Sequence, residues 1–229
     1  MASEIEKNKK LILFGYTEFA EIAYEYFTYD SEYEVCGFCA EKAFMTKDSL
    51  FGLPIVPFEE VENHFPPEEY YFYAASVYTK LNRLRKRIAD TAKEKGYRLA
   101  SYISSHAFVW RNVKIGEHVF IFEDNTVQPF VELGNNIVLW SGNHIGHHSV
   151  IKDNCFISSQ VVISGGVTIG ENCFFGVNST VNNAITVGKD CIVASGGLIY
   201  KNVPENRIVK GKEITDQSAK AYWGVEDNT

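Results

Sequence analysis

Apolar residues recur at every sixth position through the second half of the chain, from Ile103 to Ile199. The residues on this spacing are Ile103, Val109, Ile115, Ile121, Val127, Leu133, Leu139, Ile145, Ile151, Ile157, Ile163, Ile169, Phe175, Val181, Val187, Val193 and Ile199. A strand sends alternate side chains to opposite faces, so the residue two before each of these positions also faces inward. A fixed internal period predicts a solenoid, in which each repeat buries its apolar side against its neighbours.

A longer period of eighteen lies above the period of six. The segments IGEHVFIF, LGNNIVLW, IKDNCFIS, IGENCFFG and VGKDCIVA begin at positions 115, 133, 151, 169 and 187. Because eighteen is three sixes, three short strands and three corners complete one coil of a triangular prism. The pattern predicts a parallel β-helix of about five coils, with vertical neighbours roughly 4.8 Å apart. Cys155, Cys173 and Cys191 share one column, so we expect an interior ladder and no disulfide.

The first hundred residues follow a different pattern, in which apolar runs alternate with segments of helical spacing. We expect strands at 11–15, 33–40, within 52–57 and at 69–76, and helices at 18–27, within 58–65 and at 80–96. The last of these helices places Leu81, Leu84, Ile88 and Ala92 on one face and ends at Gly96. Such alternation predicts a small parallel α/β domain of the Rossmann type. The expected organisation is therefore an α/β domain at 1–101, a β-helix at 102–204 and a tail at 205–229.

Composition narrows the function classes. The net charge is −7 and 45% of the 229 residues are hydrophobic, which is typical of a globular protein and unlike a nucleic-acid binder. No apolar run approaches the roughly 20 residues of a membrane-spanning helix, and MASEIEKNKK lacks the apolar core of a signal peptide. Five cysteines, an odd number, indicate reduced thiols and a cytoplasmic protein. The Cys36–Cys39 pair lies inside a strand-like run, which argues against a redox motif.

Three of the six histidines occur in SGNHIGHHSVI, residues 141–151. The inward rule buries Asn143 and Ile145 and leaves His144 outside, while His147 and His148 follow a glycine around a corner and also face outward. One coil later, Gly165 and Gly166 occupy the same phase, so the wall beside these imidazoles has no side chains. An imidazole beside such a notch is suited to act as a general base in acyl transfer, with backbone N–H groups for the oxyanion.

Two other interpretations of this cluster stay open. It is either a solvated corner that happens to carry histidines, or part of a zinc site of the kind found in gamma-class carbonic anhydrases. Zinc needs three or four converging ligands, whereas His144 and His148 are separated by a corner and no further ligands are apparent. We therefore expect no metal.

In the α/β domain, a ligand is expected at the carboxyl ends of the strands. The first turn reads Gly15-Tyr16-Thr17-Glu18-Phe19-Ala20, which keeps only the first glycine of a dinucleotide fingerprint. Thr17 is placed either to cap the following helix or to bind a phosphate. Arg83, Arg85, Lys86 and Arg87 are candidates to meet a phosphate, although a charged outer helix face is the commoner arrangement and the one expected.

The two halves together resemble the NeuD- and PglD-like sugar acyltransferases, which are left-handed β-helix enzymes of hexapeptide repeats with an N-terminal nucleotide-sugar domain. The resemblance spans residues 10 to about 203 and rests on the period, on IGHHSVI, and on ISGGV, FGVNS and ASGGL. It implies a homotrimer with active sites between neighbouring prisms, acetyl-CoA as the acyl donor and no metal. It also implies that His147 is the catalytic base, with His148 at the place where the family often has glutamate.

By the same resemblance, acetyl-CoA is bound along the later coils, by Gly165, Gly166, Val177, Asn178, Ser195 and Gly196. The implied substrate-binding residues are Gly15, Tyr16, Thr17, Glu41 and Ser76 of the first domain and His144 of the β-helix. The expected function is N-acetylation of a nucleotide-linked amino sugar, of the 4-amino-4,6-dideoxyhexose type, in bacterial surface-glycan biosynthesis. The alternatives are O-acetylation, as of sialic acids, a non-catalytic trimeric binding module, and the zinc enzyme above. No nucleic-acid or membrane partner is expected.

Overall fold

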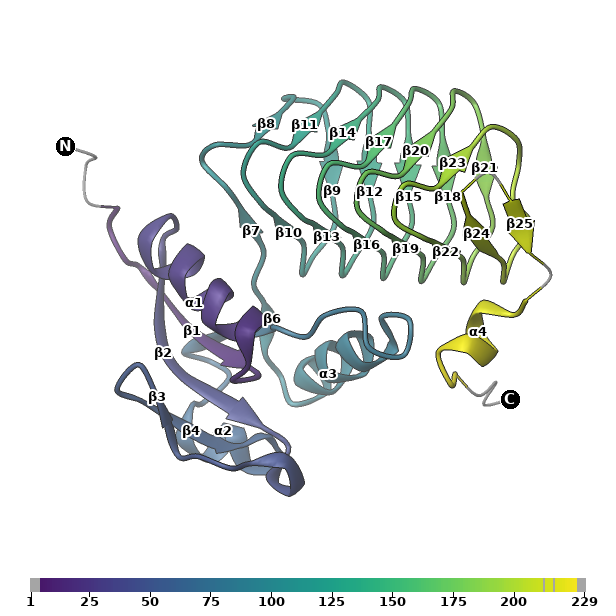
Figure 1. The fold of residues 1–229 in the computed structure, drawn as a ribbon. Coiled ribbons are helices and arrows are strands. Elements are labelled where there is room, and N and C mark those ends of the chain that lie inside the picture. Colours follow the sequence, from purple (N-terminus) through teal and green to yellow (C-terminus); the bar gives the residue numbers. More distant parts are fainter. Residues whose placement is uncertain (1–4, 212, 216, 226–229) are drawn as a thin grey trace. The chain divides into compact units, whose positions relative to one another are not determined.

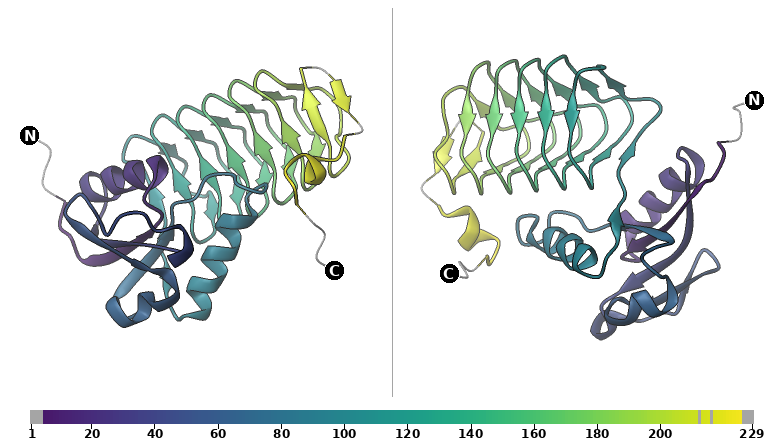
Figure 2. Two further views of the ribbon diagram at one scale, coloured as in Figure 1. Left: turned by 60° about the horizontal axis from the view of Figure 1, so that its bottom comes forward. Right: turned by 180° about the vertical axis from the view of Figure 1, so that it is seen from behind.

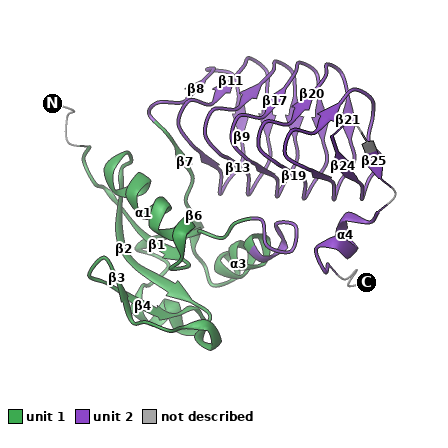
Figure 3. Ribbon diagram, viewed as in Figure 1, with its two compact units in different colours: residues 1–77, 85–104 green, residues 78–84, 105–229 purple. Residues whose placement is uncertain are grey.

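The computed structural model describes residues 5–211, 213–215 and 217–225. It divides into two compact units, one of residues 1–77 and 85–104 and the other of residues 78–84 and 105–229 (Figures 1 and 3). The first is the predicted α/β unit and the second contains the predicted β-helix. Each unit is described by itself below.

The α/β unit is built on a six-stranded sheet in the order β3-β4-β2-β1-β5-β6. Its strands are β1 (Lys9–Phe14), β2 (Tyr33–Ala40), β3 (Ser49–Leu50), β4 (Leu53–Pro57), β5 (Tyr70–Ala74) and β6 (Arg98–Leu99), and β7 (Tyr102–Ile103) leads out of the unit. The helices are α1 (Glu18–Tyr29), η1 (Lys42–Phe44), η2 (Phe58–Glu60), α2 (Val61–His64) and α3 (Arg83–Glu94). The strands pair in parallel except β3 with β4, and β1 is fully buried from Leu11 to Leu13.

Central strand β1 lies between β2 and β5, and the chain leaves β1 toward one neighbour and returns on the other. The carboxyl ends of these three strands therefore meet at the point where the strand order reverses. Crevices at such points bind ligands in doubly wound sheets.

The helix predicted over 80–96 begins later than expected. Lys80, Leu81 and Asn82 have φ of 50°, 52° and 66°, which is left-handed backbone, and α3 begins at Arg83. Leu81 is fully buried in a cluster with Ile192, and thus belongs to the second unit. The expectation that Leu81 lies on the apolar helix face was wrong, because its burial against the β-helix outweighs local helical propensity.

The second unit confirms the periods of six and eighteen. Strands of two residues repeat along three sheets: β8 (Phe108–Val109), β11 (Thr126–Val127), β14 (His144–Ile145), β17 (Val162–Ile163), β20 (Thr180–Val181) and β23 (Leu198–Ile199); β9 (Lys114–Ile115), β12 (Glu132–Leu133), β15 (Val150–Ile151), β18 (Thr168–Ile169) and β21 (Thr186–Val187); and β10 (Phe120–Ile121), β13 (Val138–Leu139), β16 (Phe156–Ile157), β19 (Phe174–Phe175) and β22 (Ile192–Val193). Every neighbouring pair is parallel with a register of eighteen, as in His144 opposite Val162. Both views in Figure 2 show the coils stacked in sequence order. The fold class is that of an N-terminal α/β domain followed in the sequence by a left-handed β-helix, as predicted.

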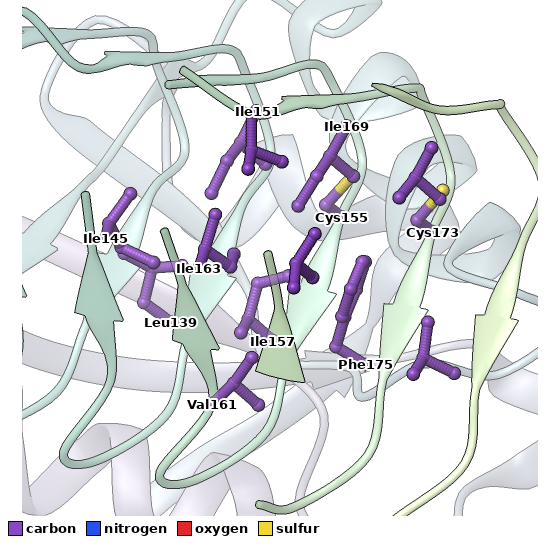
Figure 4. Close-up of a cluster of buried hydrophobic side chains, with 14 of the residues drawn as sticks. Leu139, Ile145, Ile151, Cys155, Ile157, Val161, Ile163, Ile169, Cys173 and Phe175 are labelled. Carbon is purple, nitrogen blue, oxygen red and sulfur yellow. The ribbon is translucent and has the colours of Figure 1, made fainter. Parts of the chain in front are cut away.

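The prism is filled by the residues that the period selects. The positions from Ile121 to Ile199 are buried, and their companions two residues earlier are buried with them. Figure 4 shows Cys155 and Cys173 inside this core, among isoleucines of neighbouring coils. Their thiols and that of Cys191 each donate to a carbonyl oxygen at 3.2 Å, which confirms the interior ladder. The three earliest positions differ: Val109 and Ile115 are only partly buried, and Ile103 lies outside this unit and is 42% exposed.

Beyond residue 204 the chain continues one face of the prism. Strand β24 (Ile208–Lys210) pairs in parallel with β22, and β25 (Glu213–Thr215) pairs with β24 in antiparallel fashion. Helix α4 (Ala219–Tyr222) follows and places Trp223 against Phe174. The outward side chains of this face are apolar, and α4 and residues 78–84 cover its later coils.

Candidate active site

His147 and His148 form an exposed corner between β14 and β15, as the sequence predicts. The corner is tied to the coils on both sides. The His147 amide donates to Gln128 Oε1 at 2.9 Å, and the His148 amide donates to the Pro129 carbonyl at 3.2 Å. The Gly166 amide donates to the His147 carbonyl at 2.8 Å. These bonds hold the backbone, so the rings project from a rigid support.

The His147 ring lies against Gly165 of the next coil. A Cβ added to Gly165 would lie 2.7 Å from both Cε1 and Nε2 of His147, which is closer than van der Waals contact allows. The missing side chain at Gly165 therefore leaves room for the imidazole, which lies where a Cβ would be. Glycine is required here for close approach of a side chain. At Gly166, which has φ of 70°, glycine instead suits the left-handed backbone.

The Gly165 amide is a candidate oxyanion donor. One coil earlier, the matching amide, that of His147, is satisfied by the Gln128 side chain. The residue that would play this part for Gly165 is Gly146, which has no side chain. Within the described part of the chain no group accepts a hydrogen bond from the Gly165 amide. An unpaired N–H beside a base is suited to bind a developing negative charge.

The two imidazoles are coupled to each other and to an aromatic ring. His147 Nδ1 lies 3.1 Å from His148 Nδ1, so a single hydrogen joins the two nitrogens. The Phe130 ring, one coil earlier, stacks on His148 with 4.7 Å between ring centroids and 24° between planes. Sequence reasoning missed Gln128 and gave Phe130, which it placed at the same phase one coil earlier, no role in the site. The signal that points to both is their spacing of about one coil from the histidines, 19 residues for Gln128 and His147 and 18 for Phe130 and His148.

The other histidines lie elsewhere. His144 lies on β14, between Thr126 and Val162 on the neighbouring strands, and is half-buried on the outer face of that sheet. His118 is buried, and its Nδ1 lies 2.8 Å from Asn136 Oδ1, which gives it a structural place. Among the described residues no three His, Cys, Asp or Glu side chains gather as a metal site.

The residues expected to bind acetyl-CoA occupy two different corners of the prism. Gly165 belongs to the corner of His147. Val177, Asn178, Ser195 and Gly196 form another corner, where the Gly196 amide donates to the Val177 carbonyl at 2.8 Å. Val177 is 43% exposed there. One chain therefore does not bring all these residues together.

In the α/β unit, Gly15, Tyr16, Glu41 and Ser76 all follow the carboxyl ends of adjacent strands β1, β2 and β5. Gly15 has φ of 107°, and a Cβ on it would lie 3.0 Å from the Ala75 carbonyl oxygen. The Tyr16 hydroxyl donates to the Phe44 carbonyl. The predicted substrate residues of this unit thus share one edge of the sheet, which the sequence placed there through strand order.

Thr17 stands at the N-cap position of α1, but its side chain makes no capping hydrogen bond. Glu41 forms an ion pair with Arg87 at 3.1 Å, which offsets its charge at this edge. Arg85 was expected on an outer helix face and is instead fully buried, with Nη1 donating to the Ser76 and Val77 carbonyls at 3.4 and 3.2 Å. The expectation was wrong for Arg85, because carbonyls in the segment after β5 supply acceptors for a buried guanidinium.

Within the described chain, no helix is long and apolar enough to span a membrane.

Comparison with known proteins agrees with the repeat and the fold. Residues 148–183 match the bacterial transferase hexapeptide family, described as six repeats, and residues 166–201 match the hexapeptide repeat of succinyl-transferase. No curated protein sequence matches the chain.

Several solved structures share the whole architecture. The acetyltransferase domain of PglB from Neisseria gonorrhoeae is 22% identical, with a TM-score of 0.78 over 91% of this chain and 99% of that one. A variant of perosamine N-acetyltransferase from Caulobacter crescentus, in complex with CoA and GDP-perosamine, is 20% identical, with a TM-score of 0.79 over 91% and 97%. WeeI from Acinetobacter baumannii is 17% identical, with a TM-score of 0.69 over 91% and 99%. These matches confirm the resemblance to hexapeptide-repeat acetyltransferases at the level of fold.

Proposed function

We propose that this chain is an acetyl-CoA-dependent N-acetyltransferase whose acceptor is a nucleotide-linked amino sugar of the 4-amino-4,6-dideoxyhexose type, in bacterial surface-glycan biosynthesis. The observation that carries the proposal is the His147 imidazole packed against Gly165, whose amide has no acceptor among the described residues. A base and an oxyanion donor within a few ångströms are the two groups that direct acyl transfer requires. The solved structures of the same fold include one that holds CoA and GDP-perosamine.

In the proposed reaction, the acceptor amine attacks the thioester carbonyl carbon of acetyl-CoA. The carbonyl oxygen becomes an oxyanion, which the Gly165 amide stabilises. His147 Nε2 takes the proton that the amine loses as the new C–N bond forms. The C–S bond then breaks, and the proton passes to the departing thiolate to give CoA. Catalysis needs no covalent enzyme intermediate and no metal.

A complete site on this proposal requires more than one copy of the chain. Gly165 lies on the corner of His147, whereas Val177, Asn178, Ser195 and Gly196 lie on another corner of the same prism. The position of these residues on two different corners supports the inferred homotrimer, because a trimer would place one corner of each prism beside a different corner of the next. Co-refolding of a His147→Ala chain with a Gly196→Trp chain tests this arrangement, because mixed trimers regain sites in which both contributions are intact. Activity that never exceeds that of either variant alone contradicts the shared site.

The α/β unit is the proposed nucleotide-sugar site. Gly15, Tyr16, Thr17, Glu41 and Ser76 border the strand-order reversal at β1. In the β-helix, His144 is the residue proposed to bind substrate. Because Glu41 is paired with Arg87, the edge carries less negative charge toward a diphosphate than the sequence suggests. The protein is proposed to be cytoplasmic, where acetyl-CoA is available.

Mass spectrometry of small molecules tests the function directly. The protein is incubated with acetyl-CoA and a panel of UDP-, dTDP- and GDP-linked amino sugars, with sialic acid as the hydroxyl acceptor. A mass gain of one acetyl group on an amino sugar supports the proposal and identifies the nucleotide. Acetylation of sialic acid alone replaces it with O-acetylation. Absence of both transfer and CoA binding in calorimetry points to a non-catalytic module.

A further inference from the structure

The hydrogen-bond partner of the proposed base is a second imidazole, and an imidazole carries no negative charge, unlike a carboxylate. His148 Nδ1 lies 3.1 Å from His147 Nδ1, and no carboxylate belongs to the corner segments on either side. The preceding coil contributes Gln128, Pro129 and Phe130, and the following coil contributes Ser164, Gly165 and Gly166, none of which titrates. The nearest charged or titratable groups in phase or sequence are Glu132, His144 on β14, Lys152 after β15, and Arg111, two coils earlier at the same corner. Glu132 lies on β12 opposite Val150, and its carboxylate is paired with Lys114 at 2.6 Å.

Phe130 breaks the local rule of its corner. The second residue of most corners adopts left-handed backbone, and most of these residues are Asn, Asp or Gly, which tolerate it. Phe130 has φ of 63° and leaves 56% of its surface exposed, although a bulky side chain gains nothing from that conformation. Its ring is stacked on His148. Phe130 therefore costs stability where it stands and contacts a candidate catalytic residue, which is typical of a residue that serves function.

We propose that His148 is a neutral positioning residue that accepts the His147 Nδ1–H on its own Nδ1, and that Phe130 holds the His148 ring in the plane this bond needs. This inference rests on the proposed function and concerns the same site. The arrangement fixes both tautomers, because one hydrogen lies between the two Nδ1 atoms. His147 then carries its lone pair on Nε2, toward Gly165, and His148 carries its proton on Nε2.

A proton added to either ring inactivates this pair. On His147 it occupies Nε2 and removes the base. On His148 it converts Nδ1 into a donor, so His147 must accept on Nδ1 and carry its own proton on Nε2. Protonation of either ring therefore removes the base from the proposed site.

Replacing His148 by a carboxylate should move the acid limb of the rate profile in a definite direction. A negative charge within 4–6 Å favours the protonated imidazole by about 1–3 pH units. The acid limb of kcat/KM for His148→Glu should therefore lie roughly one unit or more above that of the wild type. His148→Gln, whose side-chain oxygen accepts without charge, should keep the acid limb within about 0.5 unit, with kcat reduced less than tenfold. An unchanged limb in His148→Glu would contradict a neutral partner in the wild type.

The role of Phe130 separates binding from turnover. Phe130→Leu should lower kcat about tenfold and leave the KM for acetyl-CoA unchanged, since only the orientation of His148 is lost. Phe130→Tyr should restore kcat because it keeps the stacked ring. Phe108→Leu, at another exposed aromatic on the same prism, is the matched control and should have no effect. Equal losses in Phe130→Leu and Phe130→Tyr would overturn the positioning role.

A measurement on the resting protein tests the pair without any acceptor. Long-range ¹H–¹⁵N NMR of histidine-labelled protein reads the tautomer of each ring above pH 8, with signals assigned from His147→Ala and His148→Ala. The expected result is Nδ1–H at His147 and Nε2–H at His148. Nε2–H at His147 would overturn the inference even if acetyl transfer is observed. The expected tautomers without transfer to any acceptor would leave the pair in place and contradict the proposed function.

Discussion

Two corners of the prism have the same backbone and opposite uses. The first, the amide corner, stacks six left-handed residues along the solenoid: His118, Asn136, Asn154, Asn172, Asp190 and Asn206. Their side chains bond to one another from coil to coil, as Asn136 does to Asn154 at 2.8 Å and Asn172 to Asp190 at 3.1 Å. The second, the histidine corner, places Phe130, His148 and Gly166 at the matching positions, and its imidazoles are exposed.

The difference lies in where hydrogen bonds are satisfied. Along the amide corner, polar and charged side chains are paired with other groups of the same chain. Asp190, for example, also forms ion pairs with Arg83 at 2.6 Å and Lys220 at 3.5 Å. Along the histidine corner, glycine replaces the side chain that would satisfy the Gly165 amide, so a donor and a base remain available. One repeat thus provides both a stabilising edge and a reactive edge, according to whether polar groups are paired within the chain.

The strongest loss of activity is expected from a substitution at the histidine corner. His147→Ala should lower turnover by roughly 10²–10⁴-fold, because the amine proton loses its acceptor. The melting temperature should change little, since the ring is exposed and its backbone bonds to neighbouring coils remain. Acetyl transfer assayed beside thermal unfolding checks both. Normal turnover would remove His147 from the mechanism.

The next effect is a loss of stability from a substitution at the amide corner. Asp190→Ala should lower the free energy of unfolding by about 3 kcal/mol, because it leaves two cations and an amide without their buried acceptor. Urea unfolding measures the change. The neighbouring pair Lys189–Glu205 is exposed at 3.9 Å, so Lys189→Ala is the matched control, with a change within about 0.5 kcal/mol. Equal losses in the two variants would show that burial of Asp190 is unimportant.

Gly165→Ala should disturb the reactive edge by adding one methyl group. The new Cβ would lie 2.7 Å from the His147 ring and displace it, which should reduce turnover by about 10²-fold. In the His147→Ala background the same substitution meets no ring and should cost little more. A double-mutant cycle therefore measures the contact. Additive losses would mean that Gly165→Ala acts by some route other than the imidazole.

The smallest effect is expected from removing one side-chain hydrogen-bonding amide of the amide corner. Asn136→Ala should destabilise the protein by about 1–3 kcal/mol, since His118 and Asn154 lose a buried partner. Asn178→Ala is the matched control, because Asn178 has nearly the same φ, 56° against 55°, and is exposed. The difference between the two unfolding free energies isolates the amide bonds from the penalty of alanine in left-handed backbone. No difference would mean that the stacked amides add nothing to stability.

Much of the fold was predictable because its rules are local. A period of six needs only the identity of one residue per strand, so the coils, the inward companions and the cysteine ladder could all be predicted. The same alternation predicted that His147 and His148 face outward at a corner beside Gly165. The α/β order followed from strand and helix spacing, and it placed Gly15 and Ser76 at one edge of the sheet.

What the sequence could not decide depends on contacts between distant segments. Leu81 has helical spacing with Leu84, but its burial against the β-helix ended that pattern. Arg85 lies in a charged run, yet carbonyls in the segment after β5 hold it inside.

The repeat, the number of coils and the outward position of the histidines could be predicted from the amino-acid sequence alone, because each depends on a pattern of neighbouring residues. Three contacts arise only in the folded chain: the packing of the His147 ring on Gly165, the approach of its Nδ1 to that of His148, and the stacking of Phe130 on His148. Those contacts join side chains of successive coils. They depend on ring orientation and on close packing between coils, which no local pattern specifies.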